Sequence, residues 1–85
     1  MMGQFEQITA FLAVAEAHSF VRAAESLGIA PSSVTRTVSE LEARLGVQLL
    51  VRTTRRVSLT QAGIAFQTQV EPLIGGLAQA QNDVR

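Results

Sequence analysis

Apolar residues in the first part of the chain recur at helical spacing. From Phe5 they fall mostly three or four positions apart, and the stripe consists of Phe5, Ile8, Phe11, Leu12 and Ala15, with Val14 beside it. Residues at this spacing gather on one face of a helix, and that face can then be buried. The pattern predicts a first helix from about Phe5 that ends near His18.

A second, shorter helix is predicted after it, and the sequence marks both of its ends. Ser19 can cap the helix with its hydroxyl. Gly28 can end it, because glycine takes a left-handed conformation without steric cost. The thin apolar face of this helix is formed by Ala23, Ala24 and Leu27. Ile29 is expected to fill the core at the bend.

A third helix is predicted from Pro31 to about Leu45, with Gly46 as its end. Proline suits the first turn of a helix, where its missing N–H has no partner to lose. At about 100° per residue, one side becomes an apolar inward stripe of Val34, Val38, Leu41 and Leu45. The opposite side carries Ser32, Thr35, Arg36, Ser39 and Ala43.

The pattern then changes from helix to strand. Leu49–Arg52 and Val57–Leu59 are short, rich in β-forming residues, and flank Thr53–Arg56. A two-stranded hairpin is therefore predicted. Thr60 is a good N-cap for a fourth helix.

The fourth helix carries an apolar stripe with alternating spacings of four and three, as in a coiled coil. We expect this stripe to be a dimer interface formed by Phe66, Val70, Leu73, Leu77, Ala80 and Val84. Pro72 lies inside the helix and removes one backbone hydrogen bond, so a kink or a break is expected there.

Composition narrows the class of protein. The 85 residues are enough for one small domain, and a hydrophobic content of 47% favours a folded chain. There is no cysteine, which excludes disulfides and cysteine-based metal sites or nucleophiles. His18 is the only histidine and has no cluster of ligands around it, so neither a metal nor a cofactor is expected. No catalytic set converges, and an enzyme is not expected.

The charge distribution says more than the total charge. The formal net charge is zero, which by itself argues against nucleic-acid binding. The stretch from Pro31 to Thr60, however, has five arginines against Glu40 and Glu42, a net charge of +3. Phosphates respond to such local fields. No apolar run approaches the roughly 20 residues of a membrane span, and the N-terminus lacks the form of a secretory signal; a cytoplasmic location is expected.

The polar side of the third helix has the chemistry of a DNA recognition helix. Arg36 can bond the N7 and O6 atoms of guanine, and the methyl group of Thr35 can touch a thymine methyl. The first backbone N–H groups and the helix dipole favour a phosphate. The candidate contacts are Pro31, Ser32, Ser33, Thr35, Arg36 and Ser39. A solvated helix face is the alternative interpretation.

The tip of the hairpin has no acid and no buried apolar side chain. Its hydroxyls and arginines suit phosphate contacts or an arginine in the minor groove. The candidate wing residues are Arg52, Thr53, Thr54, Arg55 and Arg56. A solubilising turn is the alternative. Arg22, near the start of the second helix, is a further candidate for a phosphate contact.

Nearly the whole chain resembles a known family. The motifs are Phe20-x-Arg22-Ala23-Ala24-x-x-Leu27-Gly28-Ile29, the pair Thr35-Arg36, Leu41-Glu42-x-x-Leu45-Gly46-Val47-x-Leu49-Leu50, Arg52-Thr53-x-Arg55 and Leu59-Thr60-x-Ala62-Gly63. Together they resemble the N-terminal winged helix-turn-helix domain of LysR-type transcriptional regulators. The resemblance implies a mainly α fold, in which a three-helix core and a short two-stranded β-hairpin wing precede a long linker helix. Residues 1–60 would then be the DNA-binding domain, and residues 61–85 the linker and dimerisation helix.

The chain departs from the family pattern in and around the helix-turn-helix. Ala30-Pro31-Ser32 stands where Ser or Thr followed by Gln-Pro is common, and Ala30 offers no capping hydroxyl, a loss of about 1 kcal/mol. Val21 replaces a common Ser or Thr, and His18 stands where glycine often ends the first helix. These changes bear on sequence preference and not on the fold.

The leading hypothesis is sequence-specific binding of double-stranded DNA by a homodimer that acts as a transcriptional regulator. A small helical dimerisation or protein-interaction module that does not bind DNA is the alternative. Family members carry a larger C-terminal domain that binds a small-molecule effector, and a full-length form could assemble further into a tetramer. The sequence is compatible with an excised domain and with a small complete protein.

Overall fold

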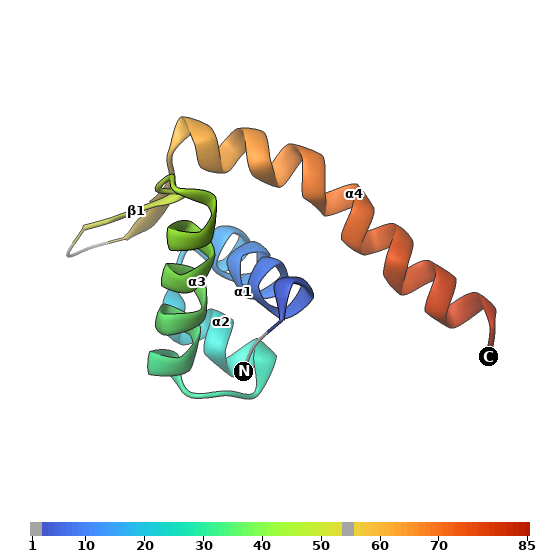
Figure 1. Cartoon of the computed structure of the whole chain (residues 1–85). Helices are drawn as coiled ribbons and strands as arrows, with labels where there is room; N and C mark the ends of the chain where they lie inside the picture. Colours follow the sequence, from blue (N-terminus) through green and yellow to red (C-terminus); the bar gives the residue numbers. More distant parts are fainter. Residues whose placement is uncertain (1–2, 54–55) are drawn as a thin grey trace.

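The computed structural model describes residues 3–53 and 56–85, and in them the chain forms a helical core, a hairpin and a long final helix (Figure 1). The elements in order are α1 (Gln4–Ala17), α2 (Phe20–Leu27), α3 (Pro31–Leu45), β1 (Leu50–Arg52), β2 (Val57–Leu59) and α4 (Gln61–Asp83). The predicted architecture, a winged helix-turn-helix followed by a long helix, is confirmed.

The predicted helix boundaries follow from local capping. The hydroxyl of Ser19 accepts a hydrogen bond from the N–H of Arg22 at 3.1 Å. The hydroxyl of Thr60 does the same for the N–H of Gly63 at 2.9 Å. Gly28 and Gly46 end α2 and α3 with φ of +71°, a left-handed conformation that glycine adopts at little cost.

His18 ends α1 in the same left-handed conformation, with φ of 54°, although it is not a glycine. The side chain has a compensating contact, since its Nδ1 lies 3.3 Å from the carbonyl oxygen of Val57 in β2. The residue that departs from the family pattern thus joins the end of α1 to the hairpin.

The core lies where α1, α2 and α3 meet and is closed by the hairpin. Its fully buried members include Phe11, Val14, Ala23, Ala24, Val34, Val38 and Leu41, and Leu49 and Leu50 cover one end. The two alanines of α2 are inaccessible to solvent, so small side chains allow α2 to approach its neighbours closely. Ile29 is half-buried and packs against this core at the bend, as expected.

Two residues predicted to lie in the core are exposed. Phe5 and Leu45 have 41% and 38% of their surface accessible. Phe5 is in the first turn of α1 and Leu45 is the last residue of α3. Each therefore lies at the end of its helix, beyond the part that packs against the other helices. Thr37 is buried instead, because its position on the wheel adjoins the apolar stripe.

The hairpin is antiparallel and short. Leu50 pairs with Leu59, Val51 with Ser58, and Arg52 with Val57. Leu50 and Val57 are buried, while the exposed Val51 lies on the opposite face, as the alternation of side chains along a strand requires.

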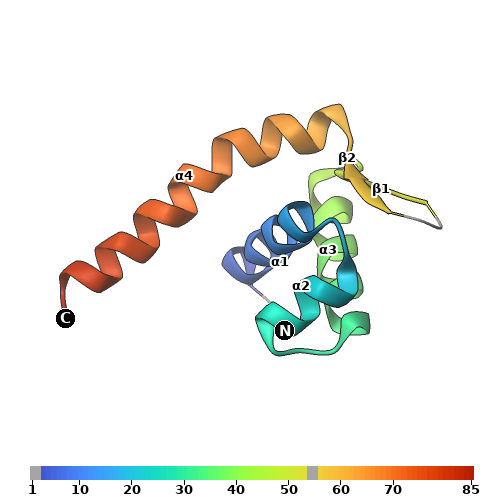
Figure 2. The same ribbon diagram turned by 180° about the vertical axis from the view of Figure 1, so that it is seen from behind.

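A kink or a break was expected at Pro72; the helix α4 is continuous from Gln61 to Asp83, so the break is wrong. A proline removes one backbone donor and crowds the preceding turn, but the hydrogen bonds on either side still hold the helix together. The ribbon changes direction about midway along α4 in both views (Figures 1 and 2).

The apolar stripe of α4 has two different environments. Its first part packs on the core: the ring centroids of Phe66 and Phe11 lie 5.6 Å apart, and Val70 is buried. Its second part extends away from the three-helix body (Figure 1). There Leu73 is 69% exposed, and Leu77 and Val84 are exposed as well. Within the described residues, no helix has the length and apolar character needed to cross a membrane.

Candidate nucleic-acid interface

The outward face of α3 is accessible along its whole length. Pro31, Ser32, Arg36 and Ser39 are exposed, and Ser33 and Thr35 are half-buried. Val34, Thr37, Val38 and Leu41 hold the opposite face in the core. The helix is therefore fixed in the domain, while Arg36 and the small polar side chains beside it remain accessible to a partner.

The start of α3 offers fewer backbone donors than expected. Ala30 is the N-cap and makes no side-chain cap, as its missing hydroxyl predicted. Pro31 has no N–H, and the N–H of Ser33 donates to the carbonyl of Ala30 at 3.0 Å. A phosphate at this terminus would depend mainly on the helix dipole and on the hydroxyl of Ser32.

Arg52 lies against the domain and not out at the hairpin tip. Its guanidinium carbon is 4.5 Å from the centroid of the Phe20 ring, at the first residue of α2. One of its N–H groups donates to the hydroxyl of Ser39 at 3.5 Å, a long hydrogen bond. The Arg52 side chain of β1 thus contacts residues of both α2 and α3.

Beyond β1, hydrogen bonds join Thr53 to Arg56 across the wing. The N–H of Thr53 donates to the carbonyl of Arg56 at 3.0 Å, and the N–H of Arg56 donates to the hydroxyl of Thr53 at 3.1 Å. Both side chains are exposed. The candidate wing residues Thr54 and Arg55 lie outside the described residues.

Glu42 has a structural role that the sequence did not indicate. Its Oε2 accepts hydrogen bonds from the N–H groups of Leu49 and Leu50, at 2.8 and 3.1 Å. The carboxylate therefore fastens the start of β1 to α3. The signal that could have indicated this role is the position of Glu42 shortly before Gly46, which ends α3, because a carboxylate there can reach the chain that follows the turn.

Two arginines have surroundings of their own. The Nε of Arg44 donates to the Oε1 of Gln7 in α1 at 3.1 Å, so Arg44 braces α3 against α1. Arg22 is exposed and borders a depression together with Glu16 and Ser26. An acid that shares this depression reduces the local positive potential near Arg22.

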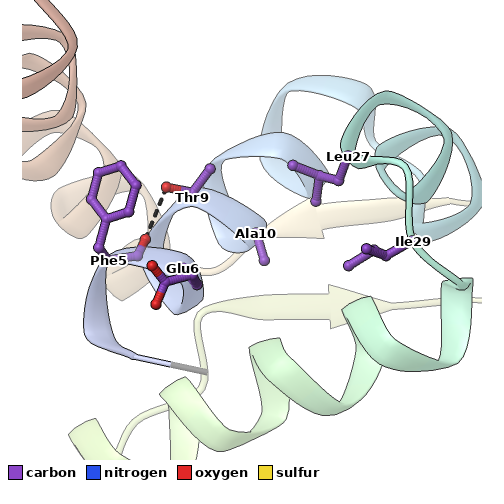
Figure 3. Close-up of a pocket in the computed structure, with 6 residues that line it drawn as sticks. All are labelled: Phe5, Glu6, Thr9, Ala10, Leu27 and Ile29. Carbon is purple, nitrogen blue, oxygen red and sulfur yellow. Dashed lines mark hydrogen bonds between the residues drawn. The ribbon is translucent and has the colours of Figure 1, made fainter. Parts of the chain in front are cut away.

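A pocket of about 170 Å³ opens between the start of α1 and the turn before α3 (Figure 3). Its lining is Phe5, Glu6, Thr9, Ala10, Leu27 and Ile29. The carboxylate of Glu6 accepts the N–H of Gly3 at 2.8 Å, and the hydroxyl of Thr9 donates to the carbonyl of Phe5 at 2.8 Å. Both polar side chains thus brace α1 itself. Residues 3–53 and 56–85 contain no group of three or more His, Cys, Asp or Glu side chains able to hold a metal ion.

Comparison with known proteins places this geometry in a family. Residues 5–64 match the model of the bacterial regulatory helix-turn-helix proteins of the lysR family. The HTH-type transcriptional regulator CrgA of Neisseria meningitidis serogroup C (strain 8013) is 43% identical over 79 residues. That match covers 93% of this chain and 26% of CrgA. The chain thus spans about a quarter of the length of the curated relatives it matches.

Two solved structures of DNA complexes have the same fold. The BenM DNA-binding domain in complex with benA site 1 DNA superposes with a TM-score of 0.89 at 33% identity, covering 96% of this chain and 92% of that one. The complex of the CbnR DNA-binding domain with DNA gives 0.87 at 36% identity, covering 98% and 95%. On the match over residues 5–64, with the fold in agreement, this chain belongs to the lysR family of bacterial regulatory helix-turn-helix proteins.

Proposed function

We propose that this chain is the DNA-binding domain of a transcriptional regulator and binds double-stranded DNA in a sequence-specific manner. The observation that carries the proposal is the outward face of α3, which is exposed, small, polar and held rigidly by the core behind it. Similar domains were crystallised in complexes with DNA. In this family of regulators, binding and not catalysis is the activity.

The contacts follow from the chemistry of the α3 face. In the proposal, α3 lies in the major groove, where its N-terminal residues meet base edges. Arg36 contacts a base, and Ser32 and Thr35 contact bases or backbone, with Pro31 and Ser33 beside them. The wing residues Arg52, Thr53, Thr54, Arg55 and Arg56 lie at the minor groove or the backbone, and Arg22 remains a further candidate for a phosphate.

The active form in this proposal is a homodimer paired through α4. Leu73, Leu77, Ala80 and Val84 are exposed on the part of the helix that extends from the body, and apolar surface of this kind favours burial against a second copy. Phe66 and Val70 pack on the core of their own chain, so their share in the interface would be at its edge. Two recognition helices would then enter successive major grooves about 34 Å apart.

The proposal also includes a cellular location, a small-molecule effector and a larger assembly. A regulator of bacterial genes works in the cytoplasm, where the chromosome is. A small-molecule effector and a tetrameric assembly would act through a C-terminal domain of a longer form.

The alternative is a protein-interaction module that dimerises without binding DNA. Its support is the zero net charge and the exposed apolar stripe of α4. The two candidates differ in their response to duplex DNA.

Binding to random-sequence duplex DNA at increasing salt separates these candidates. Each phosphate that a protein neutralises contributes about −0.9 to the slope of log K against log salt. With several phosphates neutralised, we expect a slope of about −3 or more negative. The measurement is fluorescence anisotropy with a labelled duplex. An absence of binding at low salt would favour the protein-interaction module, and selection of bound duplexes from a random pool would supply the target.

The substitution Arg36→Ala tests the base contact. Loss of a bidentate contact should weaken binding to the selected site by about 1–3 kcal/mol and relax preference at one base pair. Affinities for the selected duplex and for each single-base variant give both quantities. Equal weakening on every sequence would mean that Arg36 contacts a phosphate instead.

A further inference from the structure

The position of Arg52 in the hairpin directs its side chain toward the domain. Arg52 is two residues after the buried Leu50, and side chains two apart on a strand lie on the same face. Its cross-strand partner Val57 is also buried. The arginine therefore emerges on the inner face of the hairpin, beside α2 and α3, whereas Val51 lies on the outer face.

Two contacts hold this guanidinium in place. The ring of Phe20 lies 4.5 Å below it, within the range of cation–π attraction, and Ser39 accepts one of its N–H groups. Phe20 is itself half-buried and packs against the core. The ring thus has one side on the core and another on the cation, so the core fixes where the cation lies.

This location has a meaning in a DNA complex of the proposed kind. With α3 in the major groove and the hairpin tip at the minor groove, the sugar–phosphate strand between the two grooves must cross the surface where the hairpin base meets α3. Arg52 is the cation at that junction. An arginine that is already held in place loses less side-chain entropy when it binds than a freely rotating one.

We propose that Phe20 is a positioning residue, which holds Arg52 at the junction of α3 and the hairpin so that its guanidinium contacts a phosphate of the strand between the two grooves. Ser39 then serves as a brace for Arg52 and not as a contact to a base. This inference rests on the proposed DNA-binding function. It adds an aromatic residue of α2, which was not among the candidate DNA contacts, to the residues that determine affinity.

A double-mutant cycle on DNA affinity tests the proposal. Arg52→Ala should weaken binding to all sequences equally and make the salt slope shallower by about one. Phe20→Leu removes the aromatic face and keeps an apolar side chain, and it should weaken binding about two- to fivefold. In the Arg52→Ala background the same Phe20→Leu change should have no further effect. Phe20→Tyr keeps the aromatic face and should bind with wild-type affinity. Val51→Ala, on the outer face of β1, is the matched control and should also leave the affinity unchanged.

Three outcomes would overturn the inference. Equal weakening by Phe20→Leu with and without Arg52 would mean that the ring acts through the stability of the fold. A loss by Arg52→Ala that is confined to one base pair would mean that Arg52 contacts a base. Wild-type affinity in the Phe20→Leu variant would mean that the stacking has no role.

A measurement without DNA separates the inference from the proposed function. Stacking on Phe20 should shift the side-chain proton resonances of Arg52 upfield in the free protein, and Phe20→Leu should return them toward unstacked values. If the wild-type chain bound no duplex at any salt, the proposed function and the phosphate contact would both fail, while this shift would still report on the stacking. If the wild type bound DNA and the shift were absent, only the positioning role would fail.

Discussion

Glu42 illustrates how a single residue can be misjudged from its charge. In the sequence it is one of two acids, with Glu40, in the basic stretch from Pro31 to Thr60. In the structure its carboxylate accepts two backbone N–H groups of the returning chain and so determines where β1 begins. Hydrogen bonds to a carboxylate are stronger than those between neutral groups. The wing therefore depends on an acid for its position.

The substitution Glu42→Gln should lower the free energy of unfolding by about 1–3 kcal/mol, because the two N–H groups lose a charged acceptor. Urea denaturation followed by circular dichroism measures this. Glu40→Gln is the matched control, since Glu40 is exposed on the same helix, and a change within about 0.5 kcal/mol is expected there. Equal losses in the two variants would show that the charge of the helix, and not the contact of Glu42, is responsible.

At the scale of elements, capping and periodicity predicted most of the boundaries. Ser19, Thr60, Gly28 and Gly46 act within a few residues of their own position, so a sequence carries this information directly. The errors in predicted burial lie at helix ends, where the apolar periodicity continues beyond the neighbouring element, as with Phe5 and Leu45. The close contact of α4 with the segment before β1 is a further feature that periodicity does not encode.

That contact makes Gly63 and Gly76 a matched pair on one helix. A Cβ on Gly63 would overlap the carbonyl oxygen of Leu49, whereas a Cβ on Gly76 would have open space. Gly63→Ala should therefore destabilise the fold by about 1–3 kcal/mol, as overpacking does. Gly76→Ala should stabilise it by up to about 1 kcal/mol, because alanine favours the helix. Thermal unfolding of both variants measures the difference, and a loss of stability in both would contradict the steric explanation.

In the molecule as a whole, the helix α4 is partly packed on the core and partly exposed as an apolar surface. Its first turns pack Phe66 and Val70 on the three-helix body, and its second half leaves Leu73 and Leu77 exposed. The first part of this apolar stripe is thus packed against its own chain, and the second part is exposed and could pack against a second copy. The sequence pattern indicated a stripe along the whole helix but not this division.

The substitution Leu73→Asp should convert the proposed dimer to a monomer. The new carboxylate would lose its hydration in an apolar interface, and this desolvation costs free energy. The molar mass in sedimentation equilibrium reports this directly. Ala78→Asp, an exposed position away from the stripe, is the control and should leave the mass unchanged. A dimer that persists in the Leu73→Asp variant would place the interface on another surface.

The family, the order of the elements, the caps and the inward face of α3 could all be predicted from the amino-acid sequence, because they depend on residue type and short-range spacing. It took the packed chain to show that Glu42 fastens the wing, that Phe20 and Ser39 contact Arg52, and that Phe66 and Val70 of the α4 stripe pack on the core of their own chain. These features join residues from different elements, and their contacts exist only after the helices have packed. The pattern along the chain specified the surfaces, and the packing decided which side chains meet on them.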